Sequence, residues 1–546
     1  MKDNVQAMTR KQYYAAPVLL LVALGLSSKG ARSETAATYR RTADHCLAAH
    51  QYEQAVQNFR LEAAVYRKLG DVNAARCEER KADRWSTTLG LYTTTLPDRS
   101  AALSSFTGAK FEPVYGCYLG AYVEADDRLH DTTDAEGSLL KPEQAFGERV
   151  GKRFATFFVY CHYGNEDFPR WAKELSRHGM TPHIALEPNN GLGEVQDNEY
   201  LRNFARQAAL CHGPVFLRFA AEMNGDWTAY HNDPALYREK FKLVHDVMAR
   251  IAPNVAMIWC PNSIPEDNID QYYPGDEAVD WVGINLYSVL HHNNDRTVPG
   301  LEDPTHLLKG IYDRYSSRKP IAICEYSASH RESLAPAVDR SDVAAAKIAE
   351  MYSALPRLFP RIKLIDIFDC DNLKHARAGR QLNDYSVTDS PVVLDAFRKM
   401  VSSDYFLSRV YTSSIQQGEL PDCVRTLGAG APLTGRVPIS VSLQTFDDNA
   451  VVVYDMDSQV VGRSHKQGDY SIMLNTEPFK PGKHVLTATA FDSSARPIGH
   501  KAVVVTVGSQ TTREEAGVMK VLTPPAELNG EQDNNPNQKQ SLPVLR

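Results

Sequence analysis

The sequence has no surplus of positive charge and no cysteine spacing of a metal site. Its 546 residues carry a formal net charge of -7, whereas nucleic-acid-binding domains usually gather Lys and Arg into a basic stripe. The nine cysteines form no Cys-x-x-Cys pair, and His291 with His292 has no helical His-x-x-x-His partner. We therefore expect no nucleic-acid partner, no metal and no cofactor.

The apolar stretch at the N-terminus, Ala15 to Leu26, is too short for a comfortable membrane span. It follows Lys2, Arg10 and Lys11, and this order is typical of a signal peptide. We expect residues 1–30 to direct export, so that the protein is secreted or extracytoplasmic. Because no Ala-x-Ala site follows, an uncleaved anchor that holds the protein at a membrane or cell surface remains the alternative.

Residues 36–90 place alanines and aromatic residues at helical spacing, as in Tyr52 to Arg60 and Ala63 to Asp71. The pattern resembles one and a half tetratricopeptide repeats, whereas three or more repeats are normally needed to bury a solenoid core. We therefore favour a short helical hairpin that docks on the next domain, or spaces it from a membrane, over a partner-binding array.

Residues 108–410 alternate apolar strands with amphipathic helical patterns. Eight strands are predicted, at Tyr115 to Val123, Phe154 to Tyr160, Thr181 to Glu187, Val215 to Ala220, Val255 to Trp259, Asp280 to Leu286, Ile321 to Cys324 and Ile362 to Phe368. Eight strand and helix units match a closed (β/α)8 TIM barrel, whose catalytic groups lie at the carboxyl ends of the strands. An open doubly wound sheet would need a glycine-rich turn after its first strand, and Tyr118 to Tyr122 contains none.

Residues 430–508 change to short, partly alternating strands separated by turns such as Lys480-Pro-Gly-Lys483. This pattern predicts an immunoglobulin-like β-sandwich without the cysteine pair. Residues 509–546 lack apolar periodicity, so we expect a disordered tail there.

Two glutamates end apolar runs of the predicted barrel. Glu222 follows the fourth strand and Glu325 follows the seventh. Either glutamate alone would fit a salt bridge or a helix cap. Together, at the carboxyl ends of two barrel strands, they are the pair that glycosidic cleavage needs, in which one protonates the leaving oxygen and the other attacks or stabilises the sugar.

Sugars present apolar faces and hydroxyl groups, so their sites combine aromatic platforms with amide and charged partners. The predicted substrate-binding residues are Arg218, Asn224, Trp227, Trp259, Tyr287 and His162. Tyr287 is also placed to orient Glu325, whereas Trp281 is expected in the core. Glu187, which ends the third strand, could contact substrate or belong to a surface loop.

Five segments resemble the ordered signatures of glycoside hydrolase family 26, which comprises mainly β-mannanases on a (β/α)8 barrel. They are Arg218 to Trp227, Ile258 to Asn262, Tyr272 to Asp276, Asp280 to Tyr287 and Lys319 to Glu325. The resemblance covers about 300 residues. It implies a retaining mechanism with Glu222 as acid/base and Glu325 as nucleophile, and with Arg218, Trp227 and Tyr287 as companions.

One departure from that family lies beside the acid/base residue. Ala221 stands where the family usually has histidine and the wider clan asparagine. A methyl group cannot hydrogen-bond the sugar or the nucleophile, so about 10² to 10⁴-fold in rate could be lost if nothing substitutes. Ile367 to Asp371 also lacks the tryptophan that the family usually has at the end of strand eight.

The sequence thus predicts a retaining hydrolase of a β-linked polysaccharide or oligosaccharide, with mannan as the first substrate and endo-1,4-β-mannosidase-like action. A hydrolase of β-glucan or xylan, and a catalytically impaired glycan-binding protein of the cell surface, remain the alternatives. The oligomeric state and the linkage cleaved are not fixed by the sequence.

Overall fold

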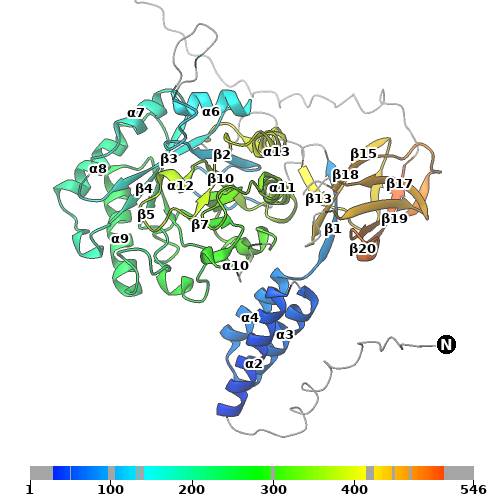
Figure 1. Cartoon of the computed structure of the whole chain (residues 1–546). Coiled ribbons are helices and arrows are strands. Elements are labelled where there is room, and N and C mark those ends of the chain that lie inside the picture. The colour runs from blue at the N-terminus through cyan, green and yellow to red at the C-terminus, as the bar shows by residue number, and fades with distance from the viewer. Residues whose placement is uncertain are drawn as a thin grey trace, which may run out of the picture.

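The computed structural model describes residues 29–508, with gaps at 50, 96–104, 131–132, 134–140, 166, 297–299, 301, 413–422, 446–448 and 466–469. The predicted signal segment up to residue 28 and the predicted tail lie outside the described residues. Within the described ranges, no helix combines the length and apolar character that crossing a membrane requires. The chain forms a three-helix unit, a barrel and a β-sandwich (Figure 1).

Eight parallel strands close into a barrel in the order β10-β8-β7-β6-β5-β4-β3-β2, with β10 pairing back onto β2. They are β2 (Cys117–Tyr122), β3 (Thr156–His162), β4 (Thr181–Glu187), β5 (Val215–Phe219), β6 (Val255–Trp259), β7 (Trp281–Ser288), β8 (Ile321–Ala328) and β10 (Ile362–Phe368). The short strand β12 (Phe406–Leu407) adds to β2. The (β/α)8 prediction is confirmed, and each observed strand overlaps a predicted one.

A ring of helices surrounds the strands (Figure 1). It comprises α6 (Pro142–Val150), α7 (Arg170–Arg177), α8 (Glu199–Ala209), α9 (Pro234–Ile251), α10 (Thr305–Tyr315), α11 (Ser341–Leu358) and α13 (Pro391–Val401), with the 3-10 helix η2 (Ile269–Tyr272) between β6 and β7. The Asp233 carboxylate caps α9 by accepting from the Leu236 N–H, and Pro234 occupies the first turn. Helix caps and apolar stripes thus fix the ring against the strands.

The barrel interior is filled by large side chains. Tyr118, Phe216 and Trp281 are fully buried there, so Trp281 is in the core as expected. Elsewhere in the barrel, Asp366 accepts hydrogen bonds from the Thr156 hydroxyl at 2.7 Å and pairs with His183 Nδ1 at 2.7 Å. The barrel is therefore a packed support for the residues at its mouth rather than an open channel.

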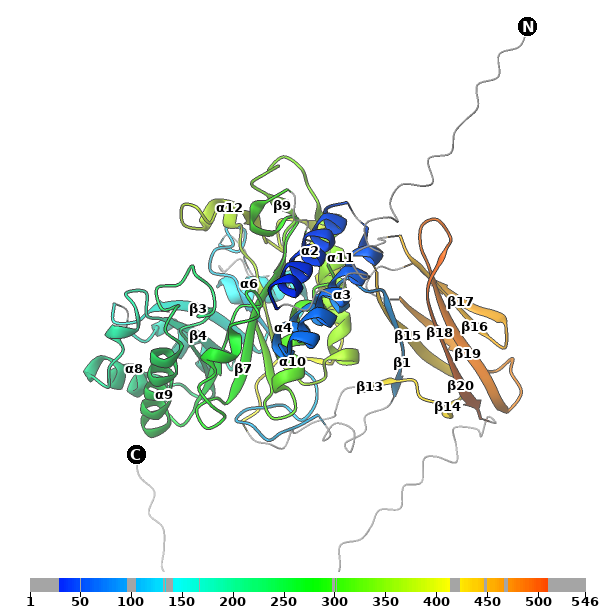
Figure 2. The same cartoon turned by 90° about the horizontal axis from the view of Figure 1, so that it is seen from below.

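The N-terminal unit consists of α2 (Lys29–Ala48), α3 (Tyr52–Leu69) and α4 (Val72–Arg84). It lies beside α10, apart from α8 and α9 (Figures 1 and 2). Arg40 of α2 binds the buried carboxylates of Glu62 in α3 and Glu78 in α4, which ties the three helices together. The unit is docked on the barrel, which is the arrangement expected for so few repeats.

The C-terminal sandwich has two sheets. One has the order β13-β1-β15-β18 and the other β14-β20-β19-β16-β17. The first comprises β13 (Cys423–Thr426), β1 (Thr88–Thr95), β15 (Arg436–Gln444) and β18 (Tyr470–Asn475); the second comprises β14 (Ala431–Leu433), β20 (Pro497–Val507), β19 (Gly482–Phe491), β16 (Val451–Met456) and β17 (Gln459–Ser464). The predicted sandwich is confirmed.

The sandwich also takes a strand from before the barrel, which corrects the boundary at residue 90. The predicted helical segment ran from 36 to 90, but β1 begins at Thr88 and pairs with β15, with Leu91 opposite Val441. The physical reason is local, because β1 is rich in β-branched threonine, which favours strands. Its Leu91 completes the sandwich core.

Candidate functional site

The two predicted glutamates face one cavity at the carboxyl ends of the barrel strands. Glu222 lies three residues beyond β5, and Glu325 lies inside β8, which continues to Ala328. Both line a cavity of about 980 Å³. Glu325 is only 4% exposed, whereas Glu222 is half-buried. The structure therefore brings together the pair that the sequence singled out.

Glu325 is held by one cation and two phenols. Arg218 Nη2 lies 2.7 Å from Glu325 Oε1, and the Tyr160 hydroxyl donates to the same oxygen at 2.8 Å. Tyr287 donates to Oε2. Burial and the Glu325 carboxylate both raise the pKa of Tyr160 and Tyr287, so the phenols stay protonated as donors. These contacts fix the orientation of the Glu325 carboxylate.

Arg218 is fully buried, which corrects its prediction as a substrate-binding residue. Its guanidinium packs over the Phe158 ring at 5.1 Å from the centroid. Although burial lowers the pKa of Arg218, Glu325 raises it, and the net shift is upward. A buried charge needs a close partner, so the role of Arg218 is to hold Glu325.

Within the described residues, the hydrogen-bond partners of Glu222 are neutral. Trp227 Nε1 donates to Oε2 at 2.6 Å, and Asn262 Nδ2 donates to Oε1 at 2.8 Å. Asn285 Nδ2 donates to the same Oε1 at 3.0 Å. The two glutamates therefore differ in kind, because a guanidinium pairs with Glu325 and only N–H dipoles reach Glu222.

Asn285 connects the two glutamates. Its Oδ1 accepts from Arg218 Nη1 at 2.9 Å while its Nδ2 donates to Glu222, and Arg218 in turn binds Glu325. The methyl group of Ala221 offers no hydrogen bond, while the amides of Asn262, in the loop after β6, and of Asn285, in β7, donate to Glu222. A donor at residue 221 would have served the sugar or Glu325, and Glu325 is held instead by two phenols and Arg218.

The backbone around Glu222 is strained. Ala220 and Glu222 have φ values of 48° and 60°, in the left-handed region that costs a non-glycine residue about 1 to 2 kcal/mol. Two bonds hold this turn: Glu222 N–H donates to the Cys260 carbonyl at 2.8 Å, and the Tyr230 hydroxyl donates to the Ala221 carbonyl at 2.7 Å. The strain aims the Glu222 carboxylate at the cavity rather than along the strand.

Asn224 does not face the cavity, and its prediction as a substrate-binding residue is wrong. Its side chain is buried and donates to the Asn262 and Pro265 carbonyls at 2.9 and 2.8 Å. It also accepts from the Asn262 N–H. A buried amide must satisfy its own hydrogen bonds, and Asn224 does so by holding the loop that carries Asn262.

Trp259 is likewise misassigned as a substrate platform. Its side chain is fully buried and packs against Tyr273 and Tyr315, with ring centroids 4.9 and 5.5 Å apart. Successive residues of a strand point to opposite faces, so Ile258 and Cys260 enter the barrel interior while Trp259 faces outward.

The remaining predicted residues lie near the mouth. Trp227 and Tyr287 line the cavity. His162 is exposed at the end of β3, where its Nδ1 lies 2.7 Å from the Asn189 amide, but it does not line the cavity. Whether His162 contacts a substrate remains a prediction.

Several cavity residues were not predicted from the sequence. They are Tyr160, Asn262, Phe368, Arg380 and Tyr385, and the buried Asn285 behind them was not predicted either. Tyr287 packs edge-on against Phe368 at 5.6 Å and lies 4.9 Å from Tyr385. Tyr160, Asn262 and Phe368 lie at or beyond the carboxyl ends of barrel strands, and this position could have predicted them from the sequence. The cavity thus has an aromatic wall beside its carboxylates.

Glu187, at the end of β4, is a third acidic group near the pair. Burial raises its pKa to about 7, and the charges of Glu325 and Glu222 add to the shift while Arg218 opposes it. Glu187 therefore exchanges its proton near neutral pH.

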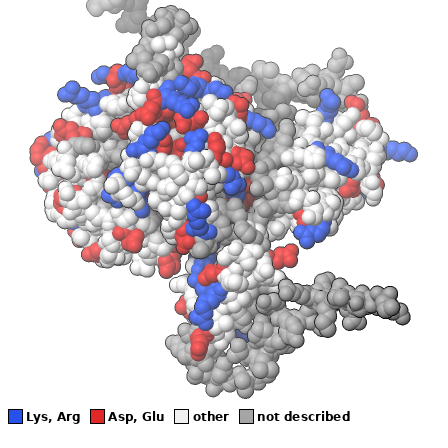
Figure 3. Space-filling view, in the orientation of Figure 1, with Lys and Arg blue, Asp and Glu red and all other residues white. Residues whose placement is uncertain are grey.

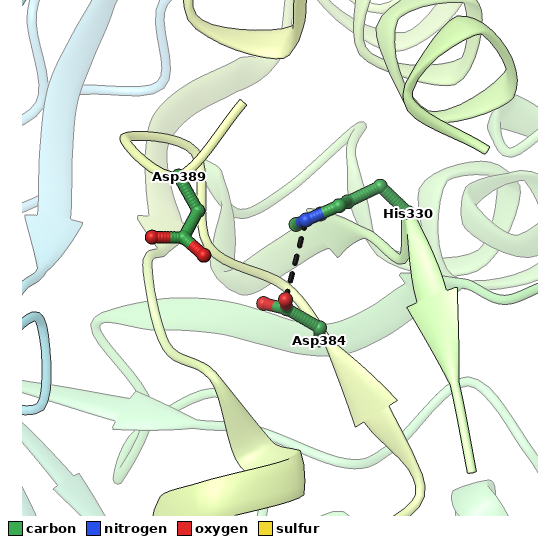
Figure 4. Close-up of side chains that lie close together, drawn as sticks. All are labelled: His330, Asp384 and Asp389. Atoms are coloured by element: carbon green, nitrogen blue, oxygen red, sulfur yellow. Dashed lines mark ion pairs between the residues drawn. The ribbon is translucent and has the colours of Figure 1, made fainter. Parts of the chain in front are cut away.

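A separate cluster joins His330, Asp384 and Asp389, whose ligand atoms lie close enough to hold a metal ion (Figure 4). His330 Nε2 lies 3.2 Å from Asp384 Oδ2. Arg331 contacts both carboxylates at 3.4 and 3.8 Å, and Arg128 pairs with Asp389. These guanidiniums supply the positive charge that a metal ion would otherwise bring to the two carboxylates. We therefore infer that the cluster stabilises the loop after β10.

Charged side chains are interspersed on the face shown in Figure 3, where Lys and Arg alternate with Asp and Glu over the barrel and the helical unit. No continuous basic track crosses that face in the part of the chain that the structure describes. The expectation of no nucleic-acid partner stays a prediction.

Comparison with known proteins finds a family model and relatives that match part of the chain. Residues 192–309 match the model described as glycosyl hydrolase family 26. A β-1,3-xylanase of Vibrio sp. is 31% identical over 123 residues, 21% of this chain and 26% of that protein. A β-1,3-xylanase of Alcaligenes sp. is 33% identical over 90 residues, 15% of this chain and 18% of that protein. The chain therefore spans about a quarter or less of these curated relatives.

Among solved structures, a GH26 β-mannanase from Bacteroides ovatus matches with 13% identity and a TM-score of 0.39. The match covers 56% of this chain and 94% of that one. GH26C from Muricauda sp. matches with 13% identity and a TM-score of 0.40, over 60% of this chain and 99% of that one.

Proposed function

We propose that this chain, which carries a glycosyl hydrolase family 26 domain, is a retaining glycosidase that acts on a β-linked polysaccharide. The observation that carries the proposal is the difference between two glutamates sharing one cavity. Glu325 is paired with a buried guanidinium, whereas Glu222 has neutral N–H donors. An ionised carboxylate and a second carboxyl that exchanges a proton are the two groups of double displacement.

In this mechanism Glu325 attacks the anomeric carbon and forms a covalent glycosyl-enzyme. Glu222 gives its proton to the leaving oxygen, and then takes a proton from the water that releases the sugar. The Arg218 guanidinium and the phenols of Tyr160 and Tyr287 keep the Glu325 carboxylate aimed at that carbon. Water is thus needed only in the second step.

The first substrate that we propose is β-mannan, as the resemblance to β-mannanases implies. A β-1,3-xylan is the second candidate, because the curated relatives at 31% and 33% identity are β-1,3-xylanases. Either polymer is neutral, and the aromatic side chains of Tyr160, Tyr287 and Phe368 suit the apolar faces of its sugars.

The test is product release from β-1,4-mannan, β-1,3-xylan, β-1,4-xylan and β-glucan by the purified full chain. We expect one polymer to be cut, and Glu222→Ala and Glu325→Ala each to lower kcat by about 10² to 10⁴-fold. Glu239→Ala, which removes an exposed glutamate of α9, is the matched control. Proton NMR of the first product should show the retained anomer.

Two outcomes would contradict the proposal. An inverted first product would exclude double displacement, and full activity in either glutamate variant would remove that residue from the reaction. Binding of one polymer without release of product would instead support a catalytically impaired glycan-binding protein.

We also propose that the protein is exported, with residues 1–30 as a cleaved signal or an uncleaved anchor. The support is the order of basic and apolar residues in that segment. Fractionation of expressing cells, with N-terminal sequencing of the mature protein, tests it, and full-length protein in the soluble cell interior would refute it.

A further inference from the structure

The three-helix unit borders the same cavity as the two glutamates. Asp44, Leu47 and Ala48 of α2 line the cavity that Glu222 and Glu325 also line. Its volume of about 980 Å³ is near the upper end of ordinary small-molecule sites. The cavity is therefore large enough for more than the two sugars that meet at a cleaved bond, and its far wall comes from outside the barrel.

The position of this wall is fixed by contacts to both other parts of the chain. Arg80 of α4 forms an ion pair with Glu266 in the loop after β6. Gln444 of the sandwich donates to the Asp83 carbonyl at 3.1 Å. Glu266 itself lies close over α10, where a Cβ at Gly310 would meet its Oε1 at 2.1 Å. The helices thus form a docked surface rather than a loose appendage.

Three cations of the unit, Arg40, Lys81 and Arg84, also line the cavity, and the first two are committed to carboxylates of the unit. Arg40 lies 3.0 Å from Glu62 and also pairs with Glu78, and Lys81 donates to Glu78 at 3.1 Å. Burial raises the pKa of Glu62 to about 7, and Glu78 adds to the shift. These groups give the wall its rigidity, and their charges are not free to select an anionic sugar.

Besides Arg40, the side chains of α2 that line the cavity are of a different kind. Asp44 and Ala48 are exposed, and Leu47 is half-buried. A carboxylate accepts hydrogen bonds from sugar hydroxyls, and small apolar side chains lie against the C–H faces of a sugar ring. This combination suits a neutral sugar unit at some distance from the cleaved bond.

We propose that α2 supplies a distal subsite of the glycan cleft, in which Asp44 binds hydroxyl groups of a neutral β-linked sugar beside Leu47 and Ala48. The inference rests on the proposed function, because it concerns a longer portion of the same substrate. Its consequence is a dependence on chain length: substrates that reach α2 gain binding energy that short substrates cannot reach. The N-terminal unit is then part of the enzyme site and not a spacer.

The experiment compares a short and a long substrate on the full chain. The probes are a 4-nitrophenyl β-mannoside and β-1,4-mannohexaose, or the matching β-xylosides if β-1,3-xylan is the polymer cut. We expect Asp44→Ala to lower kcat/KM on the hexasaccharide by about 10-fold or more, the size of one hydrogen bond to a charged group, and to leave the aryl glycoside unchanged. Ala48→Trp fills the subsite and should lower the hexasaccharide value at least as much.

Two matched variants control for changes elsewhere on the unit. Glu34→Ala removes a carboxylate from the same helix, and Ala49→Trp adds the same indole at the next residue. Both positions are exposed, and neither residue lines the cavity. We expect both controls to keep wild-type values on both probes, with thermal unfolding of all four variants close to wild type.

The outcomes separate this inference from the proposed function. If Asp44→Ala lowers kcat/KM equally on both probes, or leaves it unchanged on the hexasaccharide, the subsite is overturned. Activity of the wild-type chain on the aryl glycoside would still support the proposed function. If no probe or polymer is cut, the proposed function fails. Calorimetric titration of wild type and Asp44→Ala with the hexasaccharides then decides the subsite, and equal affinity or no binding would overturn it.

Discussion

Replacing Gly225 by alanine should lower activity by displacing the Trp227 indole, which hydrogen-bonds Glu222. A Cβ at residue 225 would lie 2.3 to 2.5 Å from three atoms of the Trp227 indole, closer than real carbon contacts allow. The ring would have to move, and its Nε1 would leave Glu222 Oε2, to which it donates at 2.6 Å. The backbone itself should tolerate alanine, because Gly225 is not among the positive-φ glycines.

The expected loss follows from that one bond. A hydrogen bond to a charged group contributes about 1.5 to 3 kcal/mol, which corresponds to about 10 to 150-fold in kcat/KM. Initial rates on the polymer that the wild-type protein cuts are the assay, and Trp227→Phe should reproduce the loss because it keeps a ring without the N–H.

Gly193→Ala is the matched control, since a Cβ there meets nothing within 4 Å. Wild-type kcat/KM in folded Gly225→Ala protein would refute the reasoning, because the indole would then be shown to serve Glu222 from some other position or not at all.

Three further predictions concern other parts of the molecule. Asn285→Ala removes the amide between Glu222 and Arg218 and should lower kcat by about 10-fold or more with little change in KM; an unchanged kcat would contradict the bridging role. Burial raises the pKa of Glu187 from its ordinary value of 4.5 to about 7. Between these two pH values the folded state binds more protons than the unfolded state, so the free energy of unfolding falls as the pH rises from 4.5 to 7. Urea unfolding across that window should show a shallower decline for Glu187→Gln, and an identical pH profile would contradict it. Leu91→Ala should destabilise the sandwich by about 2 to 4 kcal/mol in denaturant unfolding, and a change below about 1 kcal/mol would show that β1 is not part of that core.

The barrel and its carboxylate pair could be read from the sequence because both depend on local pattern. Apolar runs mark buried parallel strands, and Glu222 and Glu325 each follow such a run. What local pattern does not give is the face on which a side chain lies. Trp227 and Trp259 both stand near strand ends, yet one reaches Glu222 and the other packs outward against Tyr273.

Long-range pairing is the second limit. β1 pairs with β15 although about 350 residues separate them in the chain. The sequence of Thr88 to Thr95 favours a strand but does not predict which strand it pairs with. The placement of Asn285 is of the same kind, because a register shift between Ile284 and Asn285 sets it opposite Glu325. The three-helix unit lines the cavity because it docks on the barrel. This docking is a tertiary contact that the sequence does not predict, so no role in the site was expected for the unit.

Ala221 shows why a single departure from a motif does not decide activity. At the sequence level the missing amide or imidazole argued for a large loss of rate. In the structure Ala221 packs with the apolar interior, and amides from Asn262 and Asn285 donate to the Glu222 oxygen. Those amides serve the acid/base residue, whereas a donor at residue 221 would serve the sugar or Glu325. Glu325 is instead held by the Tyr160 and Tyr287 hydroxyls and by Arg218. The arrangement therefore favours a working pair of carboxylates over an impaired barrel, and product release by the wild-type chain is the measurement that separates the two.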